Sequence, residues 1–406
     1  MSDTETRQIN VKKRTGLALA LSGGGFRATL FHLGLLRRLN EMDLLRHVEA
    51  ISSVSGGSIT NALLAQTADR WKAQQLTPKQ WQDTIRAPLV AFCHHNIRTG
   101  PILYSLLRPW RRGEAVARLE QCYQRLLTTQ TLDALPTNVD FVFCASDLIF
   151  STMWYYRRKT SPSRRTGNYR AGWVKTWQPI PVARAVAASS CFPPIFGPQV
   201  VGLCAEDLAK PSSPPGNWAE LVGKLRLTDG GVYDNLGLEP VWDSYRYLIC
   251  SDGGKPGVSK ATRGVGQLMR YSQVMQSQVG ALRARMLIQR DKNPSLDFNA
   301  CLVGIDNQAS AGYSRSFVNE IITNIRTDLD SFSDVEACVL ENHAYSIADQ
   351  QIKKYLIPEI EWEVDPEVLN NPTLPHPDAM DESELRARMK HSHRRTLFYF
   401  LRPSWL

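Results

Sequence analysis

The strongest constraint on the fold is a strand, a tight turn and a helix that occur twice near the start of the chain. LALALS (17–22) is a continuous apolar run of the kind that forms a buried strand, and three glycines at 23–25 follow it. FRATLFHLGLLRRLNEM then carries apolar residues at helical spacing. VEAISSV (48–54) is a second strand, and SGGSITNALLAQTADRW begins a second helix. This alternation predicts an α/β fold with a central, mainly parallel sheet flanked by helices.

The rest of the chain continues the alternation of apolar runs and helical patterns. Short apolar runs that end at Gly, Pro or Asp are typical of buried strands, and longer amphipathic stretches are typical of helices. A segment rich in Pro, Asp and Glu at 357–382 predicts an irregular surface connection. The expected strands are 139–150 (one long strand or a pair), 224–231 and 245–254, the expected helices 181–190, 264–290 and 382–402, and the expected loops 161–167 and 209–218.

Composition indicates a globular protein with a buried core. Hydrophobic residues make up 43% and charged residues 21% of the 406-residue chain. No run of about 18 apolar residues is present, so no membrane span is expected. The first residues, MSDTETRQINVKKR, lack the apolar stretch of a secretory signal. The eight cysteines form no close pairs of the kind found in zinc sites or redox motifs, which predicts reduced thiols, a cytoplasmic protein and no metal.

Ser55 has the sequence context of a catalytic nucleophile. It lies between an expected strand and an expected helix, with the small residues Ser53 and Gly57 two places to either side. A sharp turn of this kind lifts a serine oxygen out of the edge of a sheet. The N-terminus of the following helix favours both a serine alkoxide and an oxyanion. A non-catalytic helix cap rich in serine and glycine would have the same sequence pattern.

The glycine turn after the first strand is a candidate oxyanion hole. Glycine lets backbone N–H groups approach a ligand without obstruction by a side chain. Gly23, Gly24 and Gly25, together with Gly56 after the nucleophile, are therefore candidate donors to a developing oxyanion.

Two other interpretations of the same turn concern phosphate groups. Arg27 is expected in the first helical turn, where it either fixes the loop or holds a phosphate. Gly23, Gly25 and Ala28 also fit the dinucleotide-binding fingerprint. That fingerprint requires an acidic residue at the end of the second strand, which here ends in serines.

Two Asp-Gly-Gly sequences compete as the source of a general base. Asp229 and Asp252 each follow an expected strand, from which a carboxylate can reach a neighbouring serine elbow and accept its proton. Each is also a common turn sequence, so the residues alone do not choose between them.

Taken together, these elements resemble the patatin-like phospholipase family, which includes patatin, neuropathy-target-esterase-like and cytosolic phospholipase A-like hydrolases. The glycine turn with its arginine (SGGGFRA), the serine elbow and the segment DGGVYDNLGLEPV carry the resemblance. AVAASSCFPPIFGP and the strand ending in SDGG also have family counterparts. The resemblance spans roughly residues 15–260. Ser53 stands where the family usually has Gly, and Ala28 where many members have Gly.

The resemblance implies a three-layer α/β sandwich that hydrolyses phospholipid or lysophospholipid esters. It implies a Ser–Asp dyad without a catalytic histidine, a metal or a cofactor, and assigns Ser55 as nucleophile, Asp229 as base and Asp252 as structural. Gly57, Gly230 and Gly231 are motif residues that support this site. We expect a loose segment at 1–14, a hydrolase domain at 15–345, and an extension at 346–406 packed on the same domain.

A Ser–Asp–His triad is the main alternative mechanism. In the common α/β-hydrolase order, the histidine follows the aspartate. The candidates after Asp229 are His343, His376, His391 and His393.

The segment 154–177 combines many Lys and Arg with many Trp and Tyr and has no acidic residue. With the net charge of +9, this composition favours an anionic partner. A peripheral membrane surface fits a lipid hydrolase, because aromatics insert at headgroup level and basic groups attract anionic lipid. A solvated β-hairpin fits equally well. Single-stranded nucleic acid fits the composition too, but no nucleic-acid partner is expected.

Overall fold

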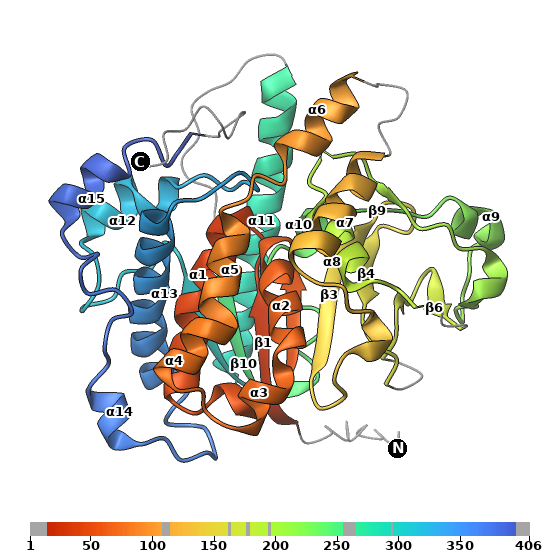
Figure 1. Ribbon diagram of the computed structural model, residues 1–406. Coiled ribbons are helices and arrows are strands. Elements are labelled where there is room, and N and C mark those ends of the chain that lie inside the picture. The colour runs from red at the N-terminus through yellow and green to blue at the C-terminus, as the bar shows by residue number, and fades with distance from the viewer. Residues whose placement is uncertain are drawn as a thin grey trace, which may run out of the picture.

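The computed structural model describes residues 14–107, 114–160, 164–175, 179–193, 196–254, 265–293 and 295–394. These residues form a single mixed sheet flanked by helices (Figure 1). The strands are β1 Thr15–Leu21, β2 Val48–Val54, β3 Asp140–Asp147, β4 Thr152–Tyr156, β5 Gly167–Asn168, β6 Gly172–Val174, β7 Gln199–Val200, β8 Leu208–Ala209, β9 Arg226–Asp229, β10 Tyr245–Asp252 and β11 Asn299–Gly304.

The central part of the sheet is parallel, in the order β11-β10-β1-β2-β3. The remaining strands continue the sheet beyond β3 in antiparallel pairs. The predicted fold class, a mainly parallel sheet flanked by helices, is confirmed.

Helices cover both faces of this sheet. Leu17, Leu19 and Leu21 of β1 belong to the large apolar cluster shared with α1 and α13, whereas Ala18 and Ala20 pack in a second cluster that includes Leu287 of α11. Because β1 is covered on both faces, its sequence is a continuous apolar run. The helices are α1 Gly25–Glu41, α2 Gly56–Gln66, α3 Ala68–Ala73, α4 Pro78–Trp81, α5 Ala87–Cys93, α6 Thr99–Leu107, α7 Glu114–Leu126, α8 Val182–Ser190, α9 Trp218–Gly223, α10 Gly231–Asp234, α11 Val265–Asp291, α12 Arg315–Glu320, α13 Asp334–Tyr355, α14 Pro366–Asn370 and α15 Glu382–Arg388.

Most elements lie where the sequence predicts them, with four differences. The segment 357–382, predicted as an irregular connection, contains the short helix α14. The second helix stops at Gln66 and resumes as α3 after Thr67. The segment 139–150 contains one strand, β3, because the chain turns at Ser151 with a φ of 53° and returns as β4. The expected C-terminal helix ends at Arg388, and the last part of its predicted range lies outside the described residues.

The C-terminal part of the chain shares the main core. α13 runs from Asp334 to Tyr355 and therefore passes through the boundary that the sequence suggests at 345. Ile352, Leu385 and Met389 belong to the same apolar cluster as β1 and α1. The expected loose segment at 1–14 lies outside the described residues except for Arg14, and so do residues 395–406. Within the described ranges, no helix is both long and apolar enough to cross a membrane.

Candidate active site

Ser55 occupies a strained turn between β2 and α2. Its φ of 49° and ψ of −114° lie in a region that non-glycine residues rarely adopt, and it caps the N-terminus of α2. The residue is 7% exposed, so it is nearly buried. Strain of this kind is characteristic of residues that the surrounding structure holds in place for a function.

The glycines around Ser55 allow two turns to pack backbone against backbone. A Cβ atom on Gly56 would come within 2.1 Å of the carbonyl oxygen of Gly25, and one on Gly57 within 2.3 Å of that of Leu21. Any side chain at either position would therefore separate the elbow from the turn that follows β1. This contact joins the predicted nucleophile to the predicted oxyanion loop.

Ser53, which replaces the usual glycine, is integrated into the sheet by hydrogen bonds. Its Oγ donates to the carbonyl of Val142 at 2.9 Å and accepts from Asn61 Nδ2 at 2.9 Å and from Ser58 Oγ at 3.1 Å. The serine therefore has a structural role at this position, and the elbow keeps its shape.

The hydrogen bonds of the glycine turn after β1 show which of its amides are available as oxyanion donors. Gly24 and Gly25 have φ values of 145° and 58°, which favour glycine. The amide of Gly23 already donates to the carbonyl of Asn235 at 3.0 Å. Over the ranges that the structure describes, the amides of Gly24, Gly25 and Gly56 donate no hydrogen bond. Gly24, Gly25 and Gly56 are therefore better candidates than Gly23 for donating hydrogen bonds to an oxyanion. Their N–H groups lie at the starts of α1 and α2 and have no partner among the described residues.

Asp229 reaches Ser55 because β2 and β9 share one edge of β3. Along that edge β2 pairs with β3 as far as Cys144, and β9 pairs with it from Ala145, which faces Asp229. The opposite edge of the same stretch is taken by β4. The end of β2 and the end of β9 therefore meet, and a Cβ on Gly230 would come within 2.4 Å of the carbonyl of Cys144.

The carboxylate of Asp229 is buried beside Ser55. Burial raises its pKa from 3.8 to about 7, although hydrogen bonds from the Gly231 amide and the Ser55 side chain oppose the shift. The Gly231 N–H donates to Asp229 Oδ1 at 2.7 Å. A carboxylate with this pKa is a stronger base at neutral pH than an ordinary aspartate.

Asp252 is separated from the nucleophile by β1. Its strand, β10, pairs with β1, which in turn pairs with β2. Asp252 accepts from the Gly254 amide at 3.1 Å, and its charge acts on the buried Arg27. The structure therefore brings Asp229, and not Asp252, to Ser55.

Arg27 points into the protein, where it fixes loops. Its guanidinium donates to the carbonyls of Gly253 at 3.0 Å, Thr323 at 3.0 Å and Ile325 at 2.8 Å. Burial lowers its pKa to about 10, and the charge of Asp252 opposes that shift. The sequence suggests that Arg27 either fixes the loop or holds a phosphate, and its hydrogen bonds to backbone carbonyls match the first role.

The candidate histidines of a triad make other contacts. His343 Nε2 donates to the carbonyl of Ile305 at 2.8 Å, and burial lowers the pKa of His343 to about 4. His376 Nε2 lies 2.6 Å from Glu341 Oε2. His391 and His393 are exposed near the end of the described chain. Among the described contacts, none joins these rings to Ser55 or Asp229.

Two residues that the sequence analysis did not select hold the site together. Ser189, at the end of α8, accepts from the Ser55 amide at 2.8 Å and bonds Ser58 Oγ at 2.9 Å, while its carbonyl accepts from the Gly230 amide at 3.2 Å. The side chain of Asn235 lies among the glycine turns, where Cβ atoms on Gly23 and Gly231 would each come within 2.5 Å of its Oδ1. Ser189 and Asn235 lie in segments that resemble family motifs, but the residues they contact are far away in sequence, so the sequence pattern alone does not reveal their roles.

Comparison with known proteins identifies the family. The model of the patatin-like phospholipase family matches residues 19–242, which is more than half of the chain. The chain belongs to the patatin-like phospholipase family. No curated protein sequence matches it.

Solved structures that resemble the chain are distant in sequence. VipD from Legionella pneumophila is 13% identical with a TM-score of 0.37, over 85% of this chain and 67% of that one. Human GIVD cytosolic phospholipase A2 is 12% identical with a TM-score of 0.45, over 93% of this chain and 63% of that one. The same human protein in complex with methyl gamma-linolenyl fluorophosphonate is 13% identical with a TM-score of 0.47, over 94% of this chain and 60% of that one. The chain thus spans only about two thirds of the length of the structures it resembles.

We predict that Ser189→Ala slows ester hydrolysis by roughly fivefold, since losing one hydrogen bond to the elbow changes a barrier by about 1 kcal/mol. The measurement is kcat on a short-chain ester together with the rate at which a fluorophosphonate probe labels Ser55. Ser190→Ala is the matched control, because Ser190 Oγ contacts Tyr123 Oη and the Val186 carbonyl instead of the elbow. Equal effects of the two variants on kcat would contradict a positioning role.

Proposed function

We propose that this member of the patatin-like phospholipase family is a lipid acyl hydrolase of the phospholipase A or lysophospholipase type. Ser55 is the nucleophile and Asp229 its base. The observation that carries the proposal is a strained, nearly buried serine whose side chain hydrogen-bonds an aspartate with a pKa raised to about 7. The family match supports the class of substrate.

In the first step, Asp229 accepts the proton of Ser55 Oγ as that oxygen attacks the ester carbonyl carbon. The short path from the Ser55 side chain to the Asp229 carboxylate supports direct transfer without an intervening histidine. Collapse of the tetrahedral intermediate expels the alcohol, which takes the proton back from Asp229. Water, activated by the same carboxylate, then hydrolyses the acyl-serine.

The negative charge on the carbonyl oxygen needs donors in each tetrahedral intermediate. The unpaired amides of Gly24, Gly25 and Gly56 are the proposed oxyanion hole. They lie at the N-termini of α1 and α2, whose dipoles add positive potential. One such donor is worth roughly 3 kcal/mol of transition-state stabilisation.

We predict that Ser55→Ala and Asp229→Ala each reduce ester hydrolysis by about 10⁴-fold or more, because the two side chains act as one unit. Asp252→Asn is the matched control for the second Asp-Gly-Gly segment and should retain substantial activity. His343→Gln should reduce the rate at most modestly. The assay is hydrolysis of a lipid panel with mass-spectrometric detection of products, with circular dichroism to verify folding. A loss on His343→Gln as large as that on Ser55→Ala, in a folded protein, would replace the dyad with a triad.

The raised pKa of Asp229 predicts a pH profile. A general base acts in its ionised form, so kcat/KM on a soluble ester should rise with pH through about 7 and then level off. Below that value the carboxyl group is protonated and accepts no proton from Ser55. A rate that stays constant from about pH 5 to pH 8 would contradict the assignment of Asp229 as base.

Burial of Asp229 also costs stability when the base is ionised. Its pKa rises from 3.8, the ordinary value for an aspartate, to about 7 in the folded protein, because the ionised form is poorly solvated there. A raised pKa means that the folded state binds the proton more tightly than the unfolded state. The resulting stability is fully present below about pH 4 and is lost as pH rises through about 7. The ionised base needed for catalysis is thus the form that the fold tolerates least, which is typical of functional sites.

The segment 154–177 is less suited to membrane contact than its composition suggests. Trp154 is 0% exposed within β4, and Tyr155 and Tyr156 are also buried. Arg157 is buried in an ion pair with Asp140 at 3.2 Å. Trp177, which the sequence also suggests as an anchor, lies outside the described residues. Trp154, Tyr155, Tyr156 and Trp173 lie in strands, as in the hairpin interpretation, whereas Tyr169 lies in a turn and is 57% exposed.

We propose instead that a peripheral membrane surface lies on α11. Tyr271, Met275, Leu282 and Met286 are all exposed, Met275 by 63%, and their spacing places them along one side of the helix. α11 also carries Arg270 and Arg285, together with Arg283 and Arg290, which pair with Asp234 and Asp243. α11 follows β10, and Figure 1 shows its first half rising beyond the end of the parallel strands at which Ser55 lies. An apolar and cationic surface of this kind suits anionic lipid.

We predict that Met275→Glu combined with Leu282→Glu lowers hydrolysis on anionic vesicles at least about tenfold and leaves hydrolysis of a soluble short-chain ester unchanged, because only lipid docking is impaired. Binding in vesicle flotation should also weaken as salt rises, since the Debye length falls from about 10 Å at 0.1 M to about 3 Å at 1 M. Tyr355→Glu, at the exposed C-terminal end of α13, is the matched control. Equal loss on both substrates would contradict the proposal, and salt-sensitive binding to oligonucleotides without binding to vesicles would favour nucleic acid instead.

A further inference from the structure

A cysteine, a histidine, a glutamate and an arginine meet in a cluster that the proposed hydrolysis does not use. Cys338 and Glu341 lie one helical turn apart on α13. His376 comes from the connection between α14 and α15, and Arg86 ends η2 (Gln82–Arg86), a π-helical segment between α4 and α5. Three segments far apart in sequence thus supply one nucleophile and three ionisable partners.

Glu341 is the centre of the cluster. Its Oε2 accepts from Arg86 Nε at 2.7 Å and lies 2.6 Å from His376 Nε2. Burial would raise the pKa of Glu341, but the hydrogen bond and charge of His376 and those of Arg86 lower it, so the carboxylate is ionised. Its second oxygen, Oε1, is buried and has no hydrogen-bond partner among the described residues.

His376 is a proton donor at neutral pH. Burial would lower its pKa, but hydrogen bonds of the ring to Cys338 and Glu341 raise it to about 9. The imidazolium is therefore the form present at neutral pH. Like the guanidinium of Arg86, it is a cation with N–H groups to donate.

The sulfur of Cys338 faces both cations. Arg86 Nη2 lies 3.6 Å from Cys338 Sγ, and the His376 ring is within hydrogen-bonding reach of the same atom. Both groups can donate a hydrogen bond to the sulfur, and their positive charge stabilises negative charge that develops on it.

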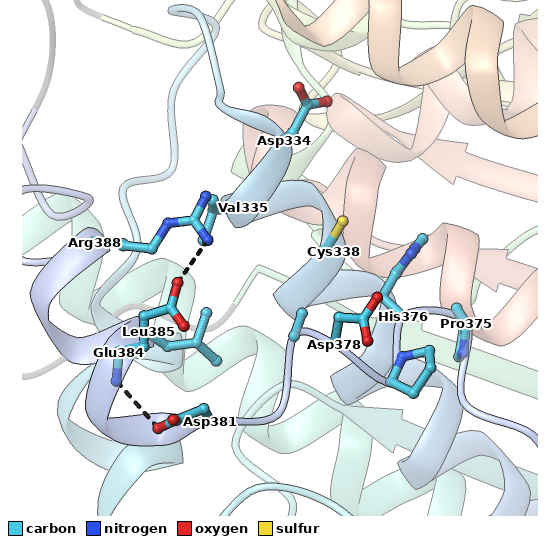
Figure 2. Close-up of a pocket in the computed structure, with 12 residues that line it drawn as sticks. Asp334, Val335, Cys338, Pro375, His376, Asp378, Asp381, Glu384, Leu385 and Arg388 are labelled. Atoms are coloured by element: carbon cyan, nitrogen blue, oxygen red, sulfur yellow. Dashed lines mark hydrogen bonds and ion pairs between the residues drawn. The ribbon is translucent and has the colours of Figure 1, made fainter. Parts of the chain in front are cut away.

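The cluster opens to solvent through a cavity of about 320 Å³ that Cys338 and His376 line. Figure 2 shows the Cys338 sulfur on α13 near His376 and Asp378. Further charged groups line the outer part of this cavity: Asp334, Asp378, Asp381, Glu384 and Arg388. Arg388 pairs with Glu384 at 3.1 Å, and Asp381 caps α15. The cavity gives a small molecule access to the thiol.

We propose that Cys338 is a reactive thiol and a modification site for small soft electrophiles, of which hydrogen peroxide is one. The thiolate sulfur attacks one oxygen of the peroxide, an S–O bond forms and the O–O bond breaks. The sulfur is oxidised to a sulfenic acid and the peroxide oxygen is reduced. The departing hydroxide takes a proton from the His376 imidazolium and leaves as water. Iodoacetamide reacts at the same sulfur by displacement of iodide.

The other cysteines of the chain provide an internal comparison. Cys204 is exposed, but its Sγ lies 3.0 Å from Asp207 Oδ2, and hydrogen bonds to the carboxylates of Asp207 and Glu206 raise its pKa. Cys122 is half-buried, and burial raises its pKa despite two nearby arginines. Cys338 is less accessible than Cys204, but the groups that hydrogen-bond its sulfur are Arg86 and His376, whereas the sulfur of Cys204 contacts a carboxylate. Accessibility and electrostatics therefore predict opposite orders of reactivity for these two thiols.

The first experiment measures the labelling rate of each cysteine in the folded, full-length protein. The protein is treated with iodoacetamide at limiting concentration, and in parallel with hydrogen peroxide and dimedone, and each cysteine peptide is quantified by mass spectrometry over time. The expected result is that Cys338 reacts at least about tenfold faster than Cys204 with both reagents. Equal rates, or faster labelling of Cys204, would overturn the proposal without any variant.

The second experiment tests the role of the two cations. His376→Gln and Arg86→Gln should each slow the labelling of Cys338 by about tenfold and leave the labelling of Cys204 unchanged, because only the first thiol loses a donor. Arg86→Lys keeps the charge and should retain part of the rate. Thermal unfolding and hydrolysis of a soluble ester verify that each variant is folded. Folded variants that label Cys338 at the wild-type rate would overturn the proposal.

Discussion

The active site depends on the way in which two strands share one edge of β3. β2 occupies that edge as far as Cys144, and β9 continues from Ala145, so the elbow after β2 and the aspartate at the end of β9 meet. A parallel sheet alone would direct Ser55 toward solvent without a carboxylate beside it. The antiparallel strand β9 places Asp229 at the level of Ser55, where both residues are buried.

Patterns local in sequence predicted the first strands and helices, the elbow at Ser55 and the two Asp-Gly-Gly turns. The choice of Asp229 over Asp252 came from the family resemblance, because it depends on strand order, and strand order is set by long-range pairing. Ser189 and Asn235 were missed for the same reason, since each acts through partners distant in sequence. The segment 154–177 shows the limit of composition: its Trp and Tyr content is the same whether the rings face lipid or, like Trp154, the core.

The C-terminal third matters because it supports the helix that begins at the glycine turn. α13 packs so closely on α1 that a Cβ on Gly34 would come within 2.1 Å of the carbonyl of Glu341. The amide of Phe26 donates to the carbonyl of Asp328 at 2.8 Å, which anchors the first turn of α1 at its other end. The candidate oxyanion amides are therefore oriented by residues well outside the segment that the family model matches. Glu341, which contacts α1 through its backbone and Arg86 and His376 through its side chain, belongs both to this support and to the Cys338 cluster.

The two proposed nucleophiles of the chain have different electrostatic surroundings. A serine hydroxyl keeps its proton at neutral pH, so Ser55 as a nucleophile needs a base, and the proposed base is a buried carboxylate with a raised pKa. A thiol reacts through its anion, and cations beside the sulfur stabilise that anion. Arg86 and the protonated His376 provide these, and Glu341 keeps both in place. Placing a carboxylate beside the sulfur has the reverse effect, as at Cys204 next to Asp207. In both proposals the charge of the neighbour, more than the exposure of the nucleophile, selects the reactive atom.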